Sequence, residues 1–104
     1  MRTTDLSHDL NELAEHMKAN SKRWFPLLDH NEVFYTLGLV GEAGELANLI
    51  KKGIRSSWGV FSLEEVAAEC ADIFTYLLLL CNQLDIDIIG AYELKEQICE
   101  ERWG

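Results

Sequence analysis

The chain has 104 residues, enough for one domain with one modest core. Its 18 acidic and 9 basic residues give a formal charge of −9, which argues against a nucleic-acid groove or an anionic membrane surface as the main partner. Three cysteines without a CxxC pair disfavour a disulfide framework or a zinc site, and the longest apolar run, Leu77 to Cys81, is too short to span a bilayer. With no signal-peptide pattern at the N-terminus, we expect a soluble cytoplasmic protein.

The first predicted helix covers Asp5 to Asn20. Apolar residues recur there at spacings of three and four from Leu6 to Met17, which is the pattern of an amphipathic helix. The stretch from Ser21 to Asp29 is expected to break this pattern at Pro26, because the residue before a proline avoids helical geometry.

The second predicted helix begins near Asp29, which with Glu32 three residues later resembles a capping arrangement. It is expected to run to about Lys52, with Gly53 as a left-handed stop. Residues 54–61 are then predicted to form a loop.

A capping box at Ser62 and Glu65 predicts the start of a third helix, which continues to about Leu84. Asp87 is expected to cap a fourth helix that ends near Trp103. No strand alternation, internal repeat or linker is evident. The sequence therefore predicts a single all-α domain over residues 1–104.

The third helix contains an acidic pair in an apolar setting. Between Ala67 and Cys81 the only charged residues are Glu69 and Asp72. A helix that is apolar on nearly all sides is expected to be buried on nearly all sides, here against a second subunit as well as its own neighbours. Residues three apart lie on adjacent strips of one helix face, so the two carboxylates repel each other and need a base, a proton or a metal.

The second helix repeats the arrangement with Glu42 and Glu45 among small and apolar residues. Within these helices no base lies close to either pair, because Lys51 and Lys52 follow Glu45 by six and seven residues. Two such helices facing each other would bring four carboxylates together, as metal-binding helical bundles do. Hard oxygen ligands without histidine favour Mg²⁺ or Mn²⁺, which would let a triphosphate approach an acidic protein and supply an activated water.

A simpler interpretation exists for each acidic pair taken alone. Glu-x-x-Glu pairs on helices are mostly solvated surface acids. The presence of two such pairs, each in an apolar helix and separated by a loop that lets the helices meet, is the observation that favours a metal site.

The spacing also resembles a known family. Glu42-x-x-Glu45, then 23 residues, then Glu69-x-x-Asp72 is similar to the ExxE…ExxD signature of the MazG-like all-α nucleoside triphosphate pyrophosphohydrolases. The surrounding segments LGLVGEAGELANLIKK and EEVAAECADIFTYL read as that family does. The likeness extends over roughly Ser21 to Leu84.

This resemblance implies a four-helix bundle-like fold, assembled as a homodimer or as a dimer of dimers. It implies Mg²⁺-dependent hydrolysis between the α- and β-phosphates, giving a nucleoside monophosphate and pyrophosphate, in a nucleotide-pool house-cleaning role. Glu42, Glu45, Glu69 and Asp72 would then be both metal ligands and catalytic residues. The substrate stays open among canonical, damaged and specialised nucleotides, with deoxynucleoside triphosphates favoured by the resemblance.

For other positions the family resemblance implies a role in substrate binding, and each position also has a simpler structural explanation. Tyr76, one turn after Asp72, corresponds to a substrate-contacting tyrosine or is an ordinary core or interface aromatic. Trp24 and Phe25 lie where family members stack aromatic rings on the base, or are packed loop residues.

Lys95 and Arg102 resemble the family's phosphate-holding basic residues, although Cys99 stands where the family often has asparagine. Lys51, Lys52 and Arg55 could also face a triphosphate, but cations are favoured at any helix C-terminus, and that explanation is preferred.

The competing hypothesis is a non-enzymatic acidic helical dimer that acts as an interaction or regulatory module. It accounts for the apolar third helix equally well. It does not account for two acidic pairs set inside apolar helices.

Overall fold

The computed structural model describes residues 3–55 and 61–104. Within these ranges the chain forms helices and no strand, which confirms the all-α prediction. The helices of the described ranges are α1 (Thr3–Trp24), α2 (Glu32–Arg55), α3 (Leu63–Gln83) and α4 (Ile88–Trp103).

Helix α1 is longer than predicted. The prediction that Ser21 leaves the helix was wrong, because the Ser21 carbonyl accepts a hydrogen bond from the Phe25 amide at 2.9 Å. The helix ends at Trp24, two residues before Pro26. The effect of the proline is therefore confined to the residue next to it.

Helix α2 begins and ends differently from the prediction. Its cap is Asn31, whose Oδ1 accepts from the Phe34 amide at 3.0 Å, whereas Asp29 accepts from the Asn31 side-chain amide. Gly53 does not end the helix. It is buried within the last turns against Phe61, and a Cβ there would overlap that ring. Of the predicted loop over 54–61, residues 56–60 lie outside the described residues.

Helix α3 begins as predicted, with Ser62 Oγ accepting from the Glu65 amide at 3.3 Å. It ends in a Schellman-type turn, in which the Ile86 amide donates to the Cys81 carbonyl at 2.8 Å. Asp85 adopts the left-handed conformation that this turn requires, with φ 55°. As a result α4, which starts after Asp87, leaves at 97° to α3.

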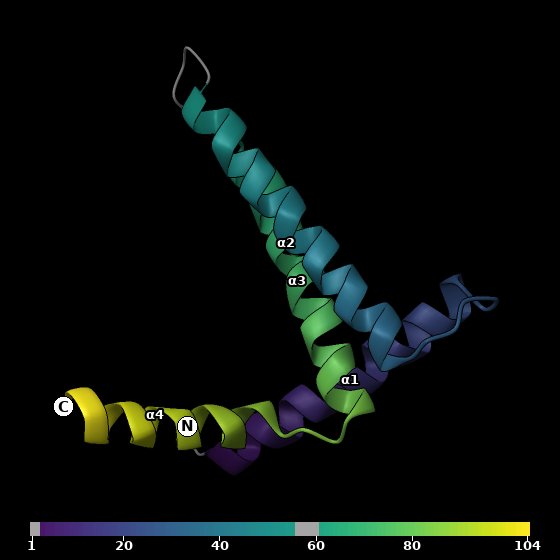
Figure 1. Ribbon diagram of the computed structural model, residues 1–104. Helices are drawn as coiled ribbons and strands as arrows, with labels where there is room; N and C mark the ends of the chain where they lie inside the picture. Colours follow the sequence, from purple (N-terminus) through teal and green to yellow (C-terminus); the bar gives the residue numbers. More distant parts are fainter. Residues whose placement is uncertain (1–2, 56–60) are drawn as a thin grey trace.

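Helices α2 and α3 run antiparallel and side by side, and α1 crosses them at the end of α3 (Figure 1). Helix α4 packs against α1 and points away from the α2–α3 pair. The buried apolar side chains gather where α1, α2 and α3 meet. They are Ala14, Tyr35, Leu78, Leu79 and Cys81.

This core is small for the length of the chain. The radius of gyration is 16.6 Å, against about 13 Å for a compact domain of 100 residues. The accessible surface is 7879 Å², whereas a compact monomer of this mass exposes roughly 6000 Å². The expectation that α3 is buried on nearly all sides is not met within one chain, since Leu63 is 76% and Phe74 41% exposed.

Among the described helices, none alone has the length and apolarity to cross a membrane, and α3 with α4 reaches that threshold only as a sharply bent pair.

Candidate metal and nucleotide site

The acidic motifs of α2 and α3 meet as the sequence predicts. Glu42 of α2 and Glu69 and Asp72 of α3 each offer one carboxylate oxygen, and these oxygens lie within 4.8 Å of one another. The two glutamates are partly buried and the aspartate is exposed. The antiparallel pairing of α2 and α3 places the three side chains together although 26 residues lie between Glu42 and Glu69 in the sequence.

The two glutamates lack hydrogen-bond donors for part of their carboxyl groups. Oε2 of Glu42 and Oε2 of Glu69 are buried, and no described residue satisfies either atom. A buried carboxylate without a donor or a counter-charge is costly. A divalent cation would satisfy both oxygens, and an all-oxygen ligand set fits Mg²⁺ or Mn²⁺.

Without a bound metal, Glu42 keeps its proton to a higher pH than an ordinary glutamate does. A hydrogen bond with Glu69 raises the pKa of Glu42 from 4.5 to about 7, and desolvation and the charges of Glu45, Asp72 and Glu69 add to the effect. Without a metal, Glu42 is therefore still partly protonated near neutral pH. Metal binding must displace that proton.

This pKa predicts how the stability of the metal-free protein depends on pH. Between pH 4.5 and about 7 the folded chain keeps a proton on Glu42 that the unfolded chain releases, so the free energy of unfolding falls as pH rises through this window. We expect the melting temperature without metal to fall from pH 5 to pH 8, and Glu42→Gln to reduce the slope. Glu96→Gln, on exposed α4, is the matched control and should leave the slope unchanged. Equal slopes in the wild type and Glu42→Gln would contradict the raised pKa of Glu42.

Glu45 is only partly brought into the site. Its charge contributes to the raised pKa of Glu42, so it lies nearby, but its oxygens are not within the group formed by Glu42, Glu69 and Asp72. It is also exposed. The structure therefore supports three converging ligands rather than the four predicted.

Tyr76 packs between α2 and α3. Its ring lies against Gly38, where a Cβ would overlap the ring, and it meets Phe34 edge to face at 6.2 Å between centroids. Desolvation, followed by the charges of Glu42 and Asp72, raises the pKa of Tyr76. Tyr76 is thus both a packed interhelical aromatic and a neighbour of the acidic group.

A pocket of about 470 Å³ adjoins the acids. Asp72 and Tyr76 line it from α3, and Trp24 and Phe25 line it from the end of α1 and the residue that follows. Both of these aromatic side chains are more than half exposed in the single chain, so they are not tightly packed loop residues within it. The structure places the predicted base-stacking residues beside one of the predicted metal ligands.

The predicted phosphate-binding residues do not reach this site within one chain. Lys95 and Arg102 lie on α4, which projects away from α2 and α3 (Figure 1), and Arg102 stacks on the neighbouring Trp103 ring at 5.9 Å. Lys51 and Lys52 are exposed near the end of α2, and the side chain of Arg55 lies outside the described residues.

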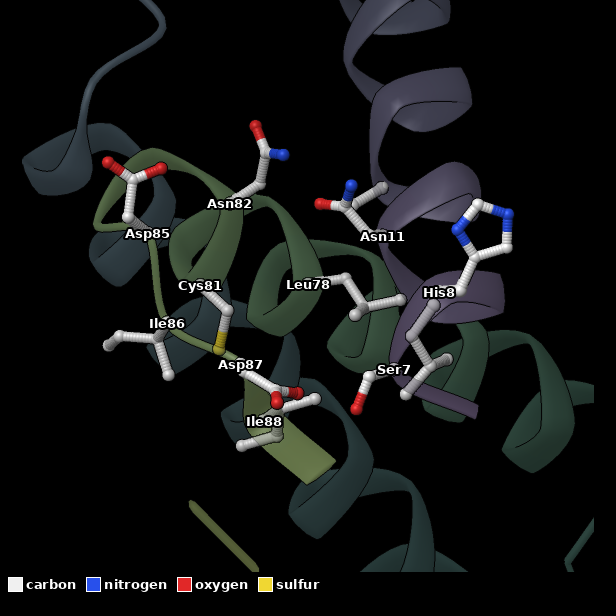
Figure 2. A pocket seen from close by; sticks show the side chains of 12 residues that line it. Ser7, His8, Asn11, Leu78, Cys81, Asn82, Asp85, Ile86, Asp87 and Ile88 are labelled. Carbon is white, nitrogen blue, oxygen red and sulfur yellow. The ribbon is translucent and has the colours of Figure 1, made fainter. Parts of the chain in front are cut away.

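A second pocket, of about 360 Å³, lies between α1, the end of α3 and the start of α4. Figure 2 shows the Cys81 sulfur, the Ser7 hydroxyl and the Asp87 carboxylate turned towards its interior. Burial raises the pKa of the Cys81 thiol, which makes it a poor nucleophile. None of the predicted site residues lines this pocket.

Comparison with known proteins identifies one limited similarity. The chain is 46% identical over 56 residues to the Gene 37 protein of Mycobacterium phage L5, an alignment that covers 51% of this chain and 49% of that protein. The chain thus matches about half the length of this relative. No family model and no solved structure matches.

Proposed function

We propose that this chain is a Mg²⁺-dependent nucleoside triphosphate pyrophosphohydrolase of the MazG-like type. The convergence of Glu42, Glu69 and Asp72 from two helices is the observation that carries the proposal. It is supported by the aromatic pocket that shares Asp72 with this group. The motif spacing and surrounding segments supply the reaction class through their resemblance to that family.

The three converging carboxylates would hold the cation, and Glu45, one turn after Glu42, is available as a further ligand or as the base that accepts a proton from the attacking water. A bound Mg²⁺ would offset the negative charge that a triphosphate meets and polarise its phosphoryl oxygens. By fixing the position of the cation, the acids would determine where the triphosphate can bind relative to the attacking water. The expected products are a nucleoside monophosphate and pyrophosphate.

The pocket beside Asp72 would bind the nucleoside. Its volume of about 470 Å³ falls in the range of small-molecule sites, roughly 300–1000 Å³. Trp24, Phe25 and Tyr76 offer ring faces on which any base can stack. This tolerance fits a house-cleaning enzyme, and deoxynucleoside triphosphates remain the favoured substrates on the family resemblance.

The test is product analysis with a panel of ribo- and deoxynucleoside triphosphates in Mg²⁺. We expect pyrophosphate and the monophosphate in equal amounts, and no activity in EDTA. Release of orthophosphate would be compatible with the metal site but would show that the protein catalyses a different hydrolysis. No turnover of any triphosphate, with Mg²⁺ demonstrably bound, would contradict the proposed function.

The active protein is proposed to be a homo-oligomer. The surface excess over a compact monomer, about 1900 Å², exceeds the roughly 800 Å² per partner of a standard interface. One face of α2 exposes Val33, Leu37 and Val40, each by more than 60%. A second copy covering these residues would complete the bundle.

We therefore expect sedimentation to show a dimer or tetramer of the 11.9 kDa chain. Leu37→Glu should dissociate it, while Leu27→Glu, at a 98% exposed loop residue, should not. A fully active 11.9 kDa species would contradict the assembly.

The position of α4 allows a further test of the proposed oligomer, because α4 carries Lys95 away from the acids of its own chain. Suppose that Lys95 binds the substrate phosphates at the acidic group of another copy. A mixture of inactive Lys95→Ala and Glu69→Gln chains should then regain activity after joint refolding. Absence of recovery, with mixed oligomers present, would place the phosphate-binding residues elsewhere.

The second candidate is a non-enzymatic acidic helical dimer, which the exposed apolar faces of α2 and α3 favour. It predicts oligomers without any Mg²⁺-dependent change in stability. Melting with and without Mg²⁺ separates the two functions.

A further inference from the structure

The wall of the nucleoside pocket depends on a short connection between α1 and α2. Trp24 and Phe25 contribute to that wall, yet they are 61% and 54% exposed and are not held by a surrounding core. Leu27 and Leu28, next along the connection, are exposed as well. Two backbone hydrogen bonds hold part of this segment, from the Phe25 amide to the Ser21 carbonyl and from the Leu28 amide to the Phe25 carbonyl, and a side-chain contact adds to them.

His30 supplies that contact. Its Nε2 lies 2.9 Å from the Phe25 carbonyl oxygen, and its Nδ1 lies 3.2 Å from Ser21 Oγ. A carbonyl oxygen only accepts, so Nε2 carries a proton and donates it to this bond. In the neutral ring Nδ1 is then the acceptor for the Ser21 hydroxyl. One side chain thus joins the last turn of α1 to the connection that follows it.

The His30 ring is itself fixed against α2. It meets Phe34 edge to face at 5.7 Å between centroids and lies 6.5 Å from Tyr35, which is only 1% exposed. Ser21, Phe25 and Phe34 all line the nucleoside pocket, whereas His30 does not. The imidazole therefore stands behind the pocket wall and touches three of the residues that form it.

We infer that His30 is a positioning residue that holds Phe25 and Trp24 in place for stacking on the nucleotide base. This role rests on the proposed function of the pocket. His30 belongs neither to the acidic group nor to the lining of the pocket. Its loss weakens nucleotide binding and leaves the metal site and the chemical step intact.

The kinetic test compares His30→Ala with His30→Gln and with His8→Ala. We expect His30→Ala to raise KM for the preferred triphosphate roughly 3- to 10-fold, the effect of one or two lost neutral hydrogen bonds, with kcat within about twofold of the wild type. Glutamine can still donate to the Phe25 carbonyl, so His30→Gln should recover most of the loss. His8, an exposed α1 residue paired with Glu12, is the matched control and should leave KM unchanged.

A second measurement does not require activity. Hydrogen exchange of the backbone amides over 25–31 should be at least about tenfold faster in His30→Ala, because the hydrogen bonds of His30 no longer oppose opening of the connection. Exchange in α3 and the Mg²⁺-dependent shift in melting temperature should stay at wild-type values.

Unchanged KM with unchanged exchange in His30→Ala would overturn the inference, as would a loss confined to kcat. If the wild type hydrolyses no triphosphate, the proposed function fails, and the exchange experiment alone decides whether His30 holds the connection.

Discussion

Glu69→Gln is expected to remove the Mg²⁺-dependent rise in melting temperature and to lower hydrolysis at least about 100-fold, because metal-assisted charge stabilisation contributes several kcal/mol to such reactions. The substitution keeps the size of the side chain and removes its charge. Since Glu69 supplies the hydrogen bond that raises the pKa of Glu42 and has a buried oxygen without a hydrogen-bond partner, it is central to the acidic group. Without metal, the variant should be at least as stable as the wild type, because the repulsion among the acids is reduced.

The matched control is Glu65→Gln, one turn earlier on the same face of α3. Glu65 is exposed, and its backbone amide donates to the Ser62 cap, a contact that the substitution keeps. The melting temperature of Glu65→Gln should rise with Mg²⁺ as it does in the wild type, and the variant should retain activity. Calorimetric Mg²⁺ titration and pyrophosphate release measure the two effects separately. A wild-type Mg²⁺ response in Glu69→Gln would refute the metal centre.

The second large effect is expected at Gly38. A Cβ at this position would overlap the Tyr76 ring, so Gly38→Ala must displace either the ring or the two helices. Overpacking of this kind costs about 1–3 kcal/mol, which outweighs the gain of up to about 1 kcal/mol from replacing a helical glycine by alanine. Because Tyr76 lies next to the acids and lines the proposed nucleoside pocket, activity should fall together with stability.

Gly44→Ala is the internal comparison, since a Cβ there meets nothing within 4 Å in the single chain. By helix propensity alone it should raise stability by up to about 1 kcal/mol, measured by urea unfolding. Destabilisation at Gly44 would show that a second copy packs closely at this point. Equal effects at Gly38 and Gly44 would contradict the close contact between Gly38 and Tyr76.

The sequence was sufficient to predict the helices and the meeting of their acids. Strong helical periodicity and the capping box at Ser62 located α3, and motif spacing on antiparallel helices brought Glu42 to Glu69 and Asp72. These features are local, or follow from the pairing of neighbouring helices, and for that reason a sequence pattern determines them.

Features that depend on contacts between distant residues could not be predicted. The sequence predicts a helix stop at Gly53, yet Gly53 lies within α2 and packs against Phe61. The role of His30 depends on hydrogen bonds that no spacing rule describes. The exclusion of Glu45 from the converging oxygens depends on the exact rotation of α2 against α3.

The left-handed residue at the end of α3 has a consequence for how this protein can evolve. The backbone conformation of Asp85 sets the direction in which all 16 residues of α4 leave the molecule. Few residues other than glycine, asparagine and aspartate adopt that conformation readily, and α4 has no buried side chain to anchor it. A single substitution at position 85 would therefore redirect α4, and with it the proposed assembly, without changing Glu42, Glu69 or Asp72.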